Sequence, residues 1–258
     1  MCRLVMAFFK SGWHIGIMSQ FFTMLYKEVK GDITPPALPD VRLQADRVVL
    51  RPPRADDWER WRTIRADNRD YLTPYEPAWP DNALEQSFWM RRQLKLYRQW
   101  HNDKRYAFVI CARDSGAIIG GVNVNNVKRK TVKRPAAGDV ADAEADAGAA
   151  NAPPQTRTVG TATFGYWIAE DRQGQGYMTE ALAALLKYCF DFLALDRIEI
   201  ACLSDNEKSM NVARRLSFTY QGVKKNYMQI NGRLQDHHIF HLTRRDFIAR
   251  QSSVPKQV

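Results

Sequence analysis

Two glycines separated by a single residue, Gly174 and Gly176, form a turn whose backbone could bind an anion. In the stretch FGYWIAEDRQGQGYMTEALAALLKYCFDFLAL, the residues up to Ala169 are typical of a strand, and from Met178 apolar residues recur at helical spacing. A helix start exposes unpaired N–H groups and the positive end of the helix dipole. Because neither glycine has a Cβ, the oxygens of an anion can approach this backbone to hydrogen-bond distance. The pattern predicts a phosphate-binding turn at the start of a helix.

Other kinds of glycine-rich turn can be compared with this one. A P-loop is excluded because the chain contains no GK[ST] sequence. A dinucleotide-binding fingerprint needs a third glycine where this chain has Thr179, followed by repeated strand–helix units. Instead, the chain has a hairpin pattern before the glycine turn and another near its C-terminal end. A tight strand-to-helix turn that binds no ligand remains the alternative to a phosphate-binding turn.

The size and charge of the chain are those of a globular protein with a basic surface. Its 258 residues, of which 45% are hydrophobic, can form one large domain or two small ones with a packed core. The 38 basic and 28 acidic side chains give a formal net charge of +10. Such a charge favours anionic partners such as nucleotides, nucleic acids or phosphate-bearing cofactors, although a basic surface without a dedicated partner has the same composition.

The four cysteines form no metal-binding or disulfide pattern. Cys2, Cys111, Cys189 and Cys202 are scattered without CxxC spacing, and three of them lie in apolar runs that suit a small buried side chain. We therefore expect a reducing, cytoplasmic location and no metal site.

The chain begins with a predicted extension over residues 1–40, of which residues 1–31 are apolar enough to be compared with a signal peptide. Lys10 and His14 interrupt them, however, and no small-residue cleavage site follows. No uninterrupted stretch approaches the roughly 20 apolar residues of a membrane span. We expect a poorly specified extension and no membrane partner, with a later start at Met18 or Met24 as an alternative.

Beyond the proline-rich connector TPPALPD, one folded domain is predicted over 41–248. Within it, the segment at about 128–158 loses its large apolar residues and carries a basic block followed by an acidic one, which predicts a disordered insert. Residues 249–258 are expected to form a flexible tail.

Hydrophobic periodicity in this domain predicts short strands and helices. Asp56 is the predicted cap of the first helix, and Asn206 or Asp205 that of the last. The stretch YLTPYEPAWPD is predicted to be an ordered loop, because its prolines exclude a helix. The predicted elements are a strand at 47–53, helices at 55–72 and 84–100, a hairpin over 105–127, a strand at 160–169, a helix from 178, a strand at 196–204, a helix at 205–218 and a hairpin with an Asn-Gly turn over 220–243.

This order of elements, together with the glycine turn, resembles the GCN5-related N-acetyltransferase (GNAT) family from Arg47 to Phe247. The resemblance implies an α/β (α+β) fold with a mixed, mostly antiparallel central sheet flanked by helices. In that family the consensus Q/R-x-x-G-x-G/A binds the pyrophosphate of the co-substrate acetyl-CoA. Here it falls on Gln173, Gly174, Gln175, Gly176, Tyr177 and Met178, of which the last departs from the family's small residue.

Within the family, the chain is most similar to the RimJ-type branch, which acetylates the N-terminal alanine of ribosomal proteins. Four stretches carry this resemblance: NRDYLTPYEP, GYWI, NEKSMNVARRLSF and YMQINGRLQDH. They imply an acetyl-CoA-dependent enzyme that acts on the N-terminal α-amine of a protein, most simply a ribosomal protein with an Ala or Ser start. Ser217 replaces the usual glycine of the family's LGF turn.

Acetyl transfer requires a bound CoA, a positioned neutral amine, stabilisation of the carbonyl oxygen and help for the departing sulfur. The resemblance implies that the backbone at Trp167 and Ile168 splays from the neighbouring strand, binds the pantetheine and donates to that oxygen. It also implies contact of Asn206 with the cofactor and of Ser209 with the sulfur. The alternative to these two contacts is that Asn206 only caps the helix and that Ser209 is exposed to solvent.

A general base is less strictly required, because a free α-amine with a pKa of about 7.7–8.0 is already roughly a tenth neutral at pH 7. Glu76, in the proline-rich loop, is a candidate for binding the incoming ammonium; the alternative is an exposed loop carboxylate. The neighbourhood KNYMQ offers Tyr227 as a proton carrier.

Two other functions remain open. One is acetylation of a small amine or antibiotic. The other is a non-catalytic ribosome-assembly or RNA-binding factor, which the net charge and the KRKTVKR block favour, while the glycine turn and Ser209 argue against it. For an enzyme, the same basic surface predicts a weak contact with ribosomal RNA. The sequence leaves the oligomeric state open.

Overall fold

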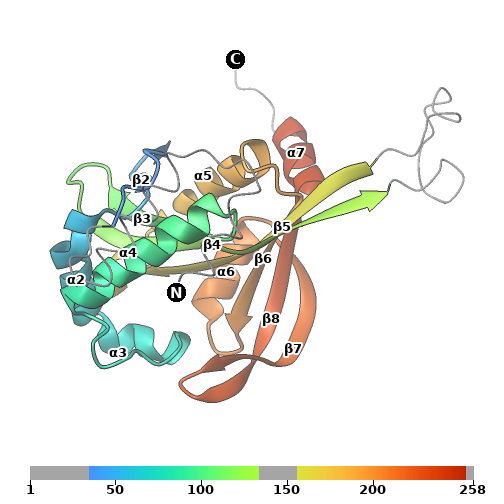
Figure 1. Cartoon of the computed structure of the whole chain (residues 1–258). Helices are drawn as coiled ribbons and strands as arrows, with labels where there is room; N and C mark the ends of the chain where they lie inside the picture. The colour runs from blue at the N-terminus through green and yellow to red at the C-terminus, as the bar shows by residue number, and fades with distance from the viewer. Residues whose placement is uncertain (1–34, 134–155, 254–258) are drawn as a thin grey trace, which may run out of the picture.

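The computed structural model describes residues 35–133 and 156–253, through which an eight-stranded sheet runs in the order β1-β2-β3-β4-β5-β6-β8-β7 (Figure 1). β5 and β6 pair in parallel, and the other neighbouring strands pair antiparallel. This sheet confirms the predicted fold class. The strands are β1 (Leu43–Gln44), β2 (Val48–Arg51), β3 (Tyr106–Ala112), β4 (Ile118–Lys133), β5 (Thr156–Ile168), β6 (Arg197–Leu203), β7 (Thr219–Ile230) and β8 (Arg233–Thr243).

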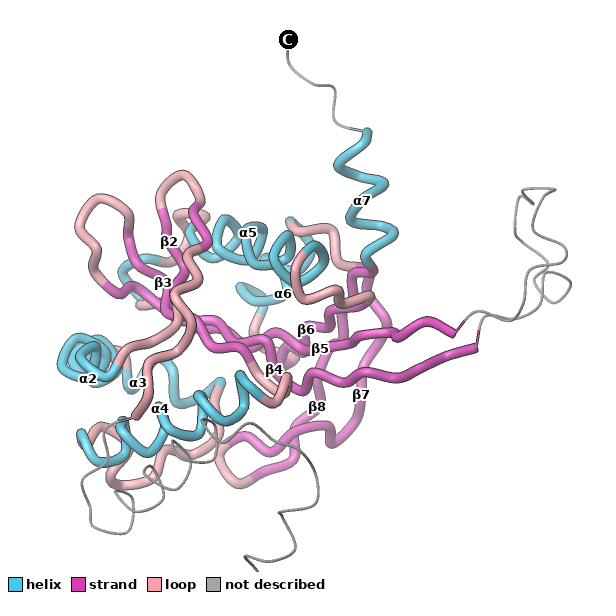
Figure 2. The backbone as a smooth tube through the Cα atoms, turned by 45° about the horizontal axis from the view of Figure 1, so that its top comes forward, coloured by secondary structure: helices cyan, strands magenta, loops and turns pink. Residues whose placement is uncertain are grey.

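Helices cover both faces of the sheet. In Figure 2, α5 and α6 lie on one side of the central strands and α4 lies on the other. None of the helices that the structure describes is long and apolar enough to cross a membrane. The helical elements are α2 (Trp58–Asp67), α3 (Arg69–Leu72), α4 (Gln86–His101), α5 (Tyr177–Asp191), α6 (Glu207–Arg215), α7 (Arg244–Ser253) and the 3-10 turns η2 (Ala55–Asp57), η3 (Thr73–Tyr75) and η4 (Glu170–Arg172).

The main core lies where α5 packs on the sheet. An apolar stripe at helical spacing on α5 is almost completely buried, with Leu182, Leu185 and Cys189 at 0% exposure. It belongs to the same cluster as Phe108 and Ile110 of β3, a strand whose seven residues are all buried. Burial of this stripe fixes the start of α5 at the end of β5, and so positions the glycine turn that joins them.

The predicted helix 55–72 is interrupted at Asn68. The buried Asn68 side chain donates to the carbonyl of Ile64 (2.8 Å) and accepts from the backbone N–H of Glu170 (2.7 Å). A side chain that bonds its own helix and a distant loop competes with helix continuation, and α3 starts afresh at the next residue. Asn68 thereby ties the α2–α3 junction to the end of β5.

The proline-rich stretch after this junction begins as helix rather than as loop. Its first residues, Tyr71 and Leu72, end α3, and Thr73–Tyr75 form the 3-10 turn η3. Tyr71 and Leu72, which fall in both the predicted helix and the predicted loop, are therefore helical, and the prediction that the prolines exclude a helix is wrong at η3. Pro74 is tolerated because a residue in the first turn of a helix needs no N–H donor.

The predicted cap at Asp56 is also wrong. Asp56 lies within η2, and the N-cap of α2 is Asp57. The Asp57 carboxylate, which is 2% exposed as a residue, accepts from the backbone N–H of Arg54 (2.8 Å) and from both terminal nitrogens of Arg51 (2.6 and 2.7 Å). The Asp57 side chain therefore closes the turn between β2 and α2, and it makes no hydrogen bond to the first N–H groups of α2 although Asp57 stands at the N-cap position.

β4 and β5 continue beyond the sheet as a two-stranded ribbon (Figure 1). Their pairing runs on from Lys128↔Thr161 to Lys133↔Thr156. The prediction of a disordered insert is thus wrong at both ends, because basic and β-branched residues can alternate in a ribbon that has solvent on both faces. The rest of the predicted insert, 134–155, lies outside the described residues.

The ends of the domain differ slightly from the prediction. Most of the predicted extension, with Met18 and Met24, lies outside the described residues, and 35–40 contain no helix or strand. The short strand β1 was not predicted. At the other end, α7 includes the first residues of the predicted tail, because Phe247 packs against Phe190 with ring centroids 5.0 Å apart.

Two turns of the C-terminal half show how backbone conformation follows the sequence. Asn231 and Gly232 have φ angles of 47° and 78°, which confirms the predicted Asn-Gly turn between β7 and β8. Ser217 adopts φ of 60°, the conformation that glycine takes most readily. Its carbonyl accepts a hydrogen bond from Arg250 of α7.

Candidate active site

The strands β5 and β6 separate near the centre of the sheet. Their parallel pairing ends at Phe164↔Ile200, whereas β5 continues to Ile168. On its other side β5 remains paired with β4 to its last residue. The backbone of Trp167 and Ile168 therefore faces an opening, which is the splayed arrangement that the family resemblance implies.

A cavity with a volume of about 1190 Å³ occupies this opening. It extends from the glycine turn at the start of α5 to the loop after η3, and it unites segments far apart in the sequence. Every predicted site residue except Gln175 lines it: Glu76, Trp167, Ile168, Gln173, Gly174, Gly176, Tyr177, Met178, Asn206, Ser209 and Tyr227.

The glycine turn presents its backbone to this cavity. Gly174 and Gly176 have φ angles of 68° and 84°, and Gly176 is the N-cap of α5. None of the N–H groups from Gly174 to Thr179 donates to another described residue. A conformation that favours glycine and a run of free donors at a helix start fit an anion such as pyrophosphate.

Arg47 holds the turn from outside. Its Nη1 donates to the carbonyl of Gln175 (3.0 Å) and its Nε to Glu180 Oε2 (2.9 Å), while its guanidinium lies 4.7 Å from the ring centre of Tyr177. Gln175 Nε2 donates to the carbonyl of Asp171 (2.8 Å). Gln175 thus acts by shaping the turn, which explains why it does not line the cavity.

Two further residues complete the turn. Gln173 Oε1 accepts from Lys208 Nζ (2.6 Å), which brings a cation of α6 beside the free N–H groups. Met178, where the family has a small residue, is 6% exposed and belongs to the core under the first turn of α5. Its side chain therefore does not fill the place of an anion.

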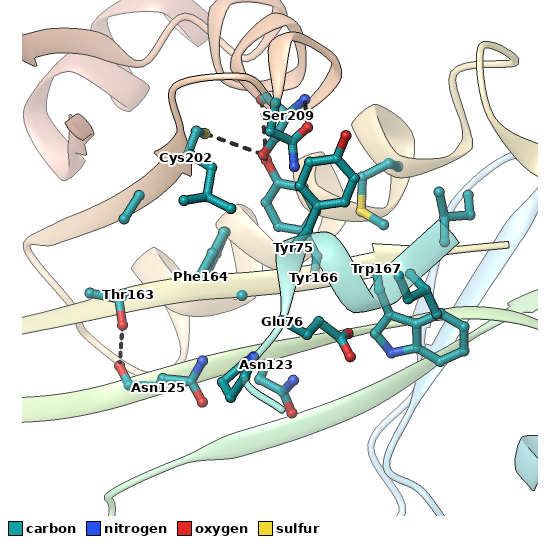
Figure 3. Close-up of a pocket in the computed structure, with 18 of the residues that line it drawn as sticks. Tyr75, Glu76, Asn123, Asn125, Thr163, Phe164, Tyr166, Trp167, Cys202 and Ser209 are labelled. Atoms are coloured by element: carbon teal, nitrogen blue, oxygen red, sulfur yellow. Dashed lines mark hydrogen bonds between the residues drawn. The ribbon is translucent and has the colours of Figure 1, made fainter. Parts of the chain in front are cut away.

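Ser209 lies between two polar side chains (Figure 3). Its Oγ is 2.8 Å from the Tyr166 hydroxyl and accepts from the Cys202 thiol (3.2 Å). Its backbone N–H donates to Asn206 Oδ1 (3.0 Å), so Asn206 is the N-cap of α6. The alternative prediction of an N-cap followed by an exposed serine is therefore right about the cap. It is wrong about the serine, because Ser209 is partly buried and lines the cavity.

Burial keeps both neighbours of Ser209 neutral. It raises the pKa of the Cys202 thiol to about 11 and raises the pKa of Tyr166 well above its ordinary value. The Cys202 thiol donates a hydrogen bond to Ser209 Oγ, and the Tyr166 hydroxyl can also donate to Ser209 Oγ. With both donating, the hydrogen of Ser209 is left for a third group in the cavity.

Glu76 is already engaged by other side chains. Arg65 donates through Nη1 to Oε1 (2.9 Å) and through Nη2 to Oε2 (2.5 Å), and Trp79 Nε1 donates to Oε2 (2.9 Å). The Arg65 guanidinium in turn lies 4.1 Å from the ring centre of Trp79 and 5.0 Å from that of Trp167. An ionised carboxylate has about four acceptor sites, so Oε1 keeps one for an incoming donor. With its side chain 24% exposed and held by three hydrogen bonds, Glu76 is not a free loop carboxylate.

Tyr227 reaches the cavity from the edge strand β7 and is 37% exposed. Its ring packs edge-on against the buried His237, with centroids 5.7 Å apart. His237 Nδ1 lies 2.9 Å from the carbonyl of Gln235, which assigns the hydrogen to Nδ1 and leaves Nε2 as an acceptor. Within the described part of the chain, Tyr227 makes no hydrogen bond to Ser209 or Glu76.

Sequence reasoning missed several side chains that the structure places in the cavity, above all Tyr166, Cys202, Arg65 and His237. Tyr166 stands in the GYWI stretch, whose backbone alone was considered. A strand alternates its side chains, so Tyr166 and Trp167 point to opposite faces, and Tyr166 faces α6. That alternation could have identified Tyr166. No local sequence pattern predicts that Cys202 or His237 lines the cavity.

No group of three His, Cys, Asp or Glu side chains is arranged as metal ligands among the residues that the structure describes. The prediction that the site needs no metal stays a prediction.

Comparison with known proteins agrees with this geometry. The model of the Acetyltransferase (GNAT) domain matches residues 47–219. The ribosomal protein uS5-alanine N-acetyltransferase of Escherichia coli (strain K12) is 29% identical over 213 residues, which cover 81% of this chain and 94% of that protein.

Solved structures are similar as well. RimJ of Mycobacterium smegmatis, solved in complex with CoA-disulfide, has 25% identity and a TM-score of 0.62, covering 84% of this chain and 98% of that one. The ribosomal-protein-S5-alanine acetyltransferase of Vibrio fischeri has 24% identity and a TM-score of 0.63, covering 81% and 99%, and shows the shared fold. With the splayed strands, the glycine turn and a family model that spans most of the domain, the chain belongs to the GNAT family of N-acetyltransferases.

Proposed function

We propose that this acetyltransferase transfers the acetyl group of acetyl-CoA to the N-terminal α-amine of a protein, namely a ribosomal protein with an Ala or Ser start. One observation carries the proposal: a single cavity joins the free N–H groups of the glycine turn, the Ser209 hydroxyl and the Glu76 carboxylate. The similarity to ribosomal protein N-acetyltransferases over most of the chain supports the choice of acceptor. Such an enzyme meets its acceptors in the cytoplasm.

The first half of the cavity would bind acetyl-CoA. The N–H groups of Gly174 and Gly176, with Lys208 beside them, would hold its pyrophosphate. At Trp167 and Ile168 the backbone is unpaired on the β6 side in the described sheet. Successive N–H groups of a strand point to opposite sides, and the Ala169 N–H donates to the carbonyl of Ile119 on the β4 side, so the N–H of Ile168 is the one that would donate to the carbonyl oxygen of the thioester. Acetyl-CoA supplies an activated acetyl group, and the protein contributes position and hydrogen bonds.

The second half would hold the acceptor. The remaining acceptor site on Glu76 Oε1 would bind and orient the α-ammonium, whose proton passes to water. Because the α-amine is already partly neutral at pH 7, no strong base is required. Arg65 and Trp79 fix the carboxylate, so the amine is placed without rearrangement of the loop.

Ser209 would assist the departing sulfur. Its oxygen accepts from Cys202 and can accept from Tyr166, which leaves its own hydrogen to donate to the sulfur as negative charge develops there. Asn206 would act indirectly by capping α6, and so would keep Ser209 in place. Tyr227 lies too near the cavity rim to replace Ser209, and it is proposed to carry a proton to solvent.

We propose a second, weaker interaction for the two-stranded ribbon that β4 and β5 form beyond the sheet. Lys128 and Lys130 are exposed on β4, whereas Arg129 pairs with Asp103 and Arg157 with Asp196. The exposed lysines support a salt-sensitive contact with ribosomal RNA that would raise the local concentration of acceptors.

The function is tested by incubating the protein with acetyl-CoA and purified ribosomal proteins, followed by mass spectrometry of their N-termini. We expect the mass of one added acetyl group on one Ala- or Ser-starting N-terminus, and none when that α-amine is blocked. Acetylation of lysine side chains in blocked proteins, or of free amines alone, would contradict the proposal. The Ser209→Ala variant serves as the matched control for catalysis by this site.

A further inference from the structure

The cavity contains far more positive than negative charge. Glu76 is the one carboxylate among the described residues that line it, and Arg65 already pairs with Glu76. A cavity of this composition is suited to anionic ligands. Its cationic lining consists of Arg65, Arg92, Lys104, Arg105, Lys128, Arg172, Lys208 and Arg215.

These cations fall into two groups by their place in the fold. Arg172, Lys208 and Arg215 belong to η4 and α6, beside the glycine turn where the phosphates of CoA would lie. Apart from Arg65 of α2, which pairs with Glu76, the remaining cations form the second group and come from α4, from the link between α4 and β3, and from β4. In Figure 2, α4 lies on the far side of the central strands from α5 and α6. The phosphates of CoA therefore do not account for this second group.

Arg92 is partly buried and has no carboxylate partner among the described residues. Its guanidinium lies 5.3 Å from the ring centre of Trp61 and 5.4 Å from that of Trp89. These cation–π contacts stabilise the charge but leave its N–H donors unused. Within the described part of the chain, Arg92 forms no ion pair and no hydrogen bond to an acceptor. Burial, together with the positive charges of Arg105 and Arg65, lowers the pKa of Arg92 to about 10.

Arg105, in the link just before β3, also lacks a carboxylate partner in the part of the chain that the structure describes. Its Nε is buried and has no hydrogen-bond partner among the described residues. Burial lowers the pKa of Arg105, and the charge of Arg105 acts on Arg92. Two neighbouring guanidinium groups that repel each other in a partly desolvated place are stabilised by an anion that both can contact.

The place of this pair relates it to the acceptor. Arg92 and Arg65 lie 5.3 and 6.0 Å from the centre of the same ring, that of Trp61. Because Arg65 pairs with Glu76, Arg92 is near the carboxylate that would hold the α-amine. Phe88, one turn before Arg92 on α4, also lines the cavity. A peptide whose α-amine lies at Glu76 extends by about 3.3–3.6 Å per residue, so side chains of its first few residues can reach this part of the cavity.

Building on the proposed function, we propose that Arg92 and Arg105 form a subsite for a carboxylate of the acceptor, an Asp or Glu side chain within its first five residues. The guanidinium groups would bind the carboxylate through charge-assisted hydrogen bonds. The subsite would select acceptors that combine a free α-amine with a nearby acidic residue. Acetylation chemistry at the α-amine is unchanged by this contact, and no group is transferred at the subsite.

The test uses the full chain and Ala-starting peptides in which one Glu is moved through positions 2 to 5, each compared with its Gln twin. In the wild-type protein we expect one Glu peptide to exceed its twin in kcat/KM by roughly ten- to a hundredfold, mainly through KM. In Arg92→Gln and Arg105→Gln that ratio should fall to near one. Arg91→Gln, which removes the same charge from the exposed side of α4, should keep the wild-type ratio.

The outcomes separate the two proposals. If the wild-type protein acetylates the Glu and Gln peptides equally at every position, the subsite is disproved while N-terminal acetylation stands. If Arg91→Gln lowers the ratio as much as Arg92→Gln, the effect is one of overall charge and the subsite is again disproved. If no peptide is acetylated although acetyl-CoA binds, the proposed function fails and the subsite fails with it. The wild-type ratio should also decrease as salt is added, a result that requires no variant to fold.

Discussion

Ser209 Oγ lies 2.8 Å from the hydroxyl oxygen of Tyr166, a contact that joins the first turn of α6 to the end of β5. The contact links α6, which carries Ser209 as the proposed proton donor, to β5, whose backbone would hold the thioester. A shift of either element would separate the donor from the reacting atoms. The Tyr166 hydroxyl also contacts the backbone carbonyl of Ser209 (3.3 Å), so one tyrosine couples the two sides of the reaction.

Ser209→Ala should lower kcat by about a hundredfold, because the departing sulfur loses its hydrogen-bond donor. Tyr166→Phe, which keeps Ser209 but removes one of its partners, should lower kcat less. Stopped-flow detection of released thiol gives kcat, and calorimetry gives the affinity for acetyl-CoA. An unchanged kcat in Ser209→Ala, with normal cofactor affinity, would remove Ser209 from the mechanism.

Gly176→Asp should abolish acetyl-CoA binding, because the left-handed conformation at Gly176 disfavours any side chain and a carboxylate there would repel the pyrophosphate. Even a Cβ at Gly176 would come within 3.3 Å of Arg47 Nη2. Gly116→Asp is the matched control: Gly116 has φ of 68° in the turn between β3 and β4, has room for a Cβ, and is not among the described residues that line the cavity. Calorimetry should show normal affinity in the control, and binding in Gly176→Asp would refute the role of the turn.

Glu76→Gln should keep acetyl-CoA binding but lower kcat/KM for an Ala-starting peptide by roughly ten- to a hundredfold, the effect of losing one charge-assisted contact. It also leaves Arg65 without its carboxylate partner, and a paired Arg65→Gln, Glu76→Gln variant controls for that loss. Steady-state rates with free and α-blocked peptides provide the measurement. Wild-type behaviour of Glu76→Gln would show that the amine is held elsewhere.

Ser217→Gly should stabilise the protein by about 1 kcal/mol, because a non-glycine residue with φ of 60° is strained by roughly that amount. Ser204→Gly, at an exposed turn position without a positive φ, should give no gain. Thermal unfolding monitored by circular dichroism compares the two variants. A lower melting temperature for Ser217→Gly would show that the serine side chain itself stabilises the turn.

The parts of the site that the sequence predicts are those set by local structure. Gly174 and Gly176 are recognisable because a helix start and a left-handed turn both depend on residues close in the chain. Asn206 and Ser209 are three residues apart at a helix start, which places the cap and the hydroxyl together without any knowledge of the fold. The Asn231-Gly232 turn was predictable for the same reason.

Arg92 and His237 could not be predicted, because each lies in an element whose own pattern is explained by packing, and Arg105 lies in a short link without any pattern. They meet only when α4, β3 and β8 are placed around the opening between β5 and β6. The ribbon of β4 and β5 was missed for a different reason. Its strands have solvent on both faces, so they lack the apolar alternation by which a strand is recognised.

The separation of β5 from β6 also suggests how such an enzyme can diversify. The thioester would be held by main-chain groups and by a turn at the start of α5, whereas the acceptor would meet side chains from α2, α4 and the loop that carries Glu76. Substitutions in those segments could change the choice of acceptor without disturbing the machinery that handles acetyl-CoA. Grafting α4 and residues 68–85 between relatives is therefore a route to engineered acceptor specificity on an unaltered scaffold.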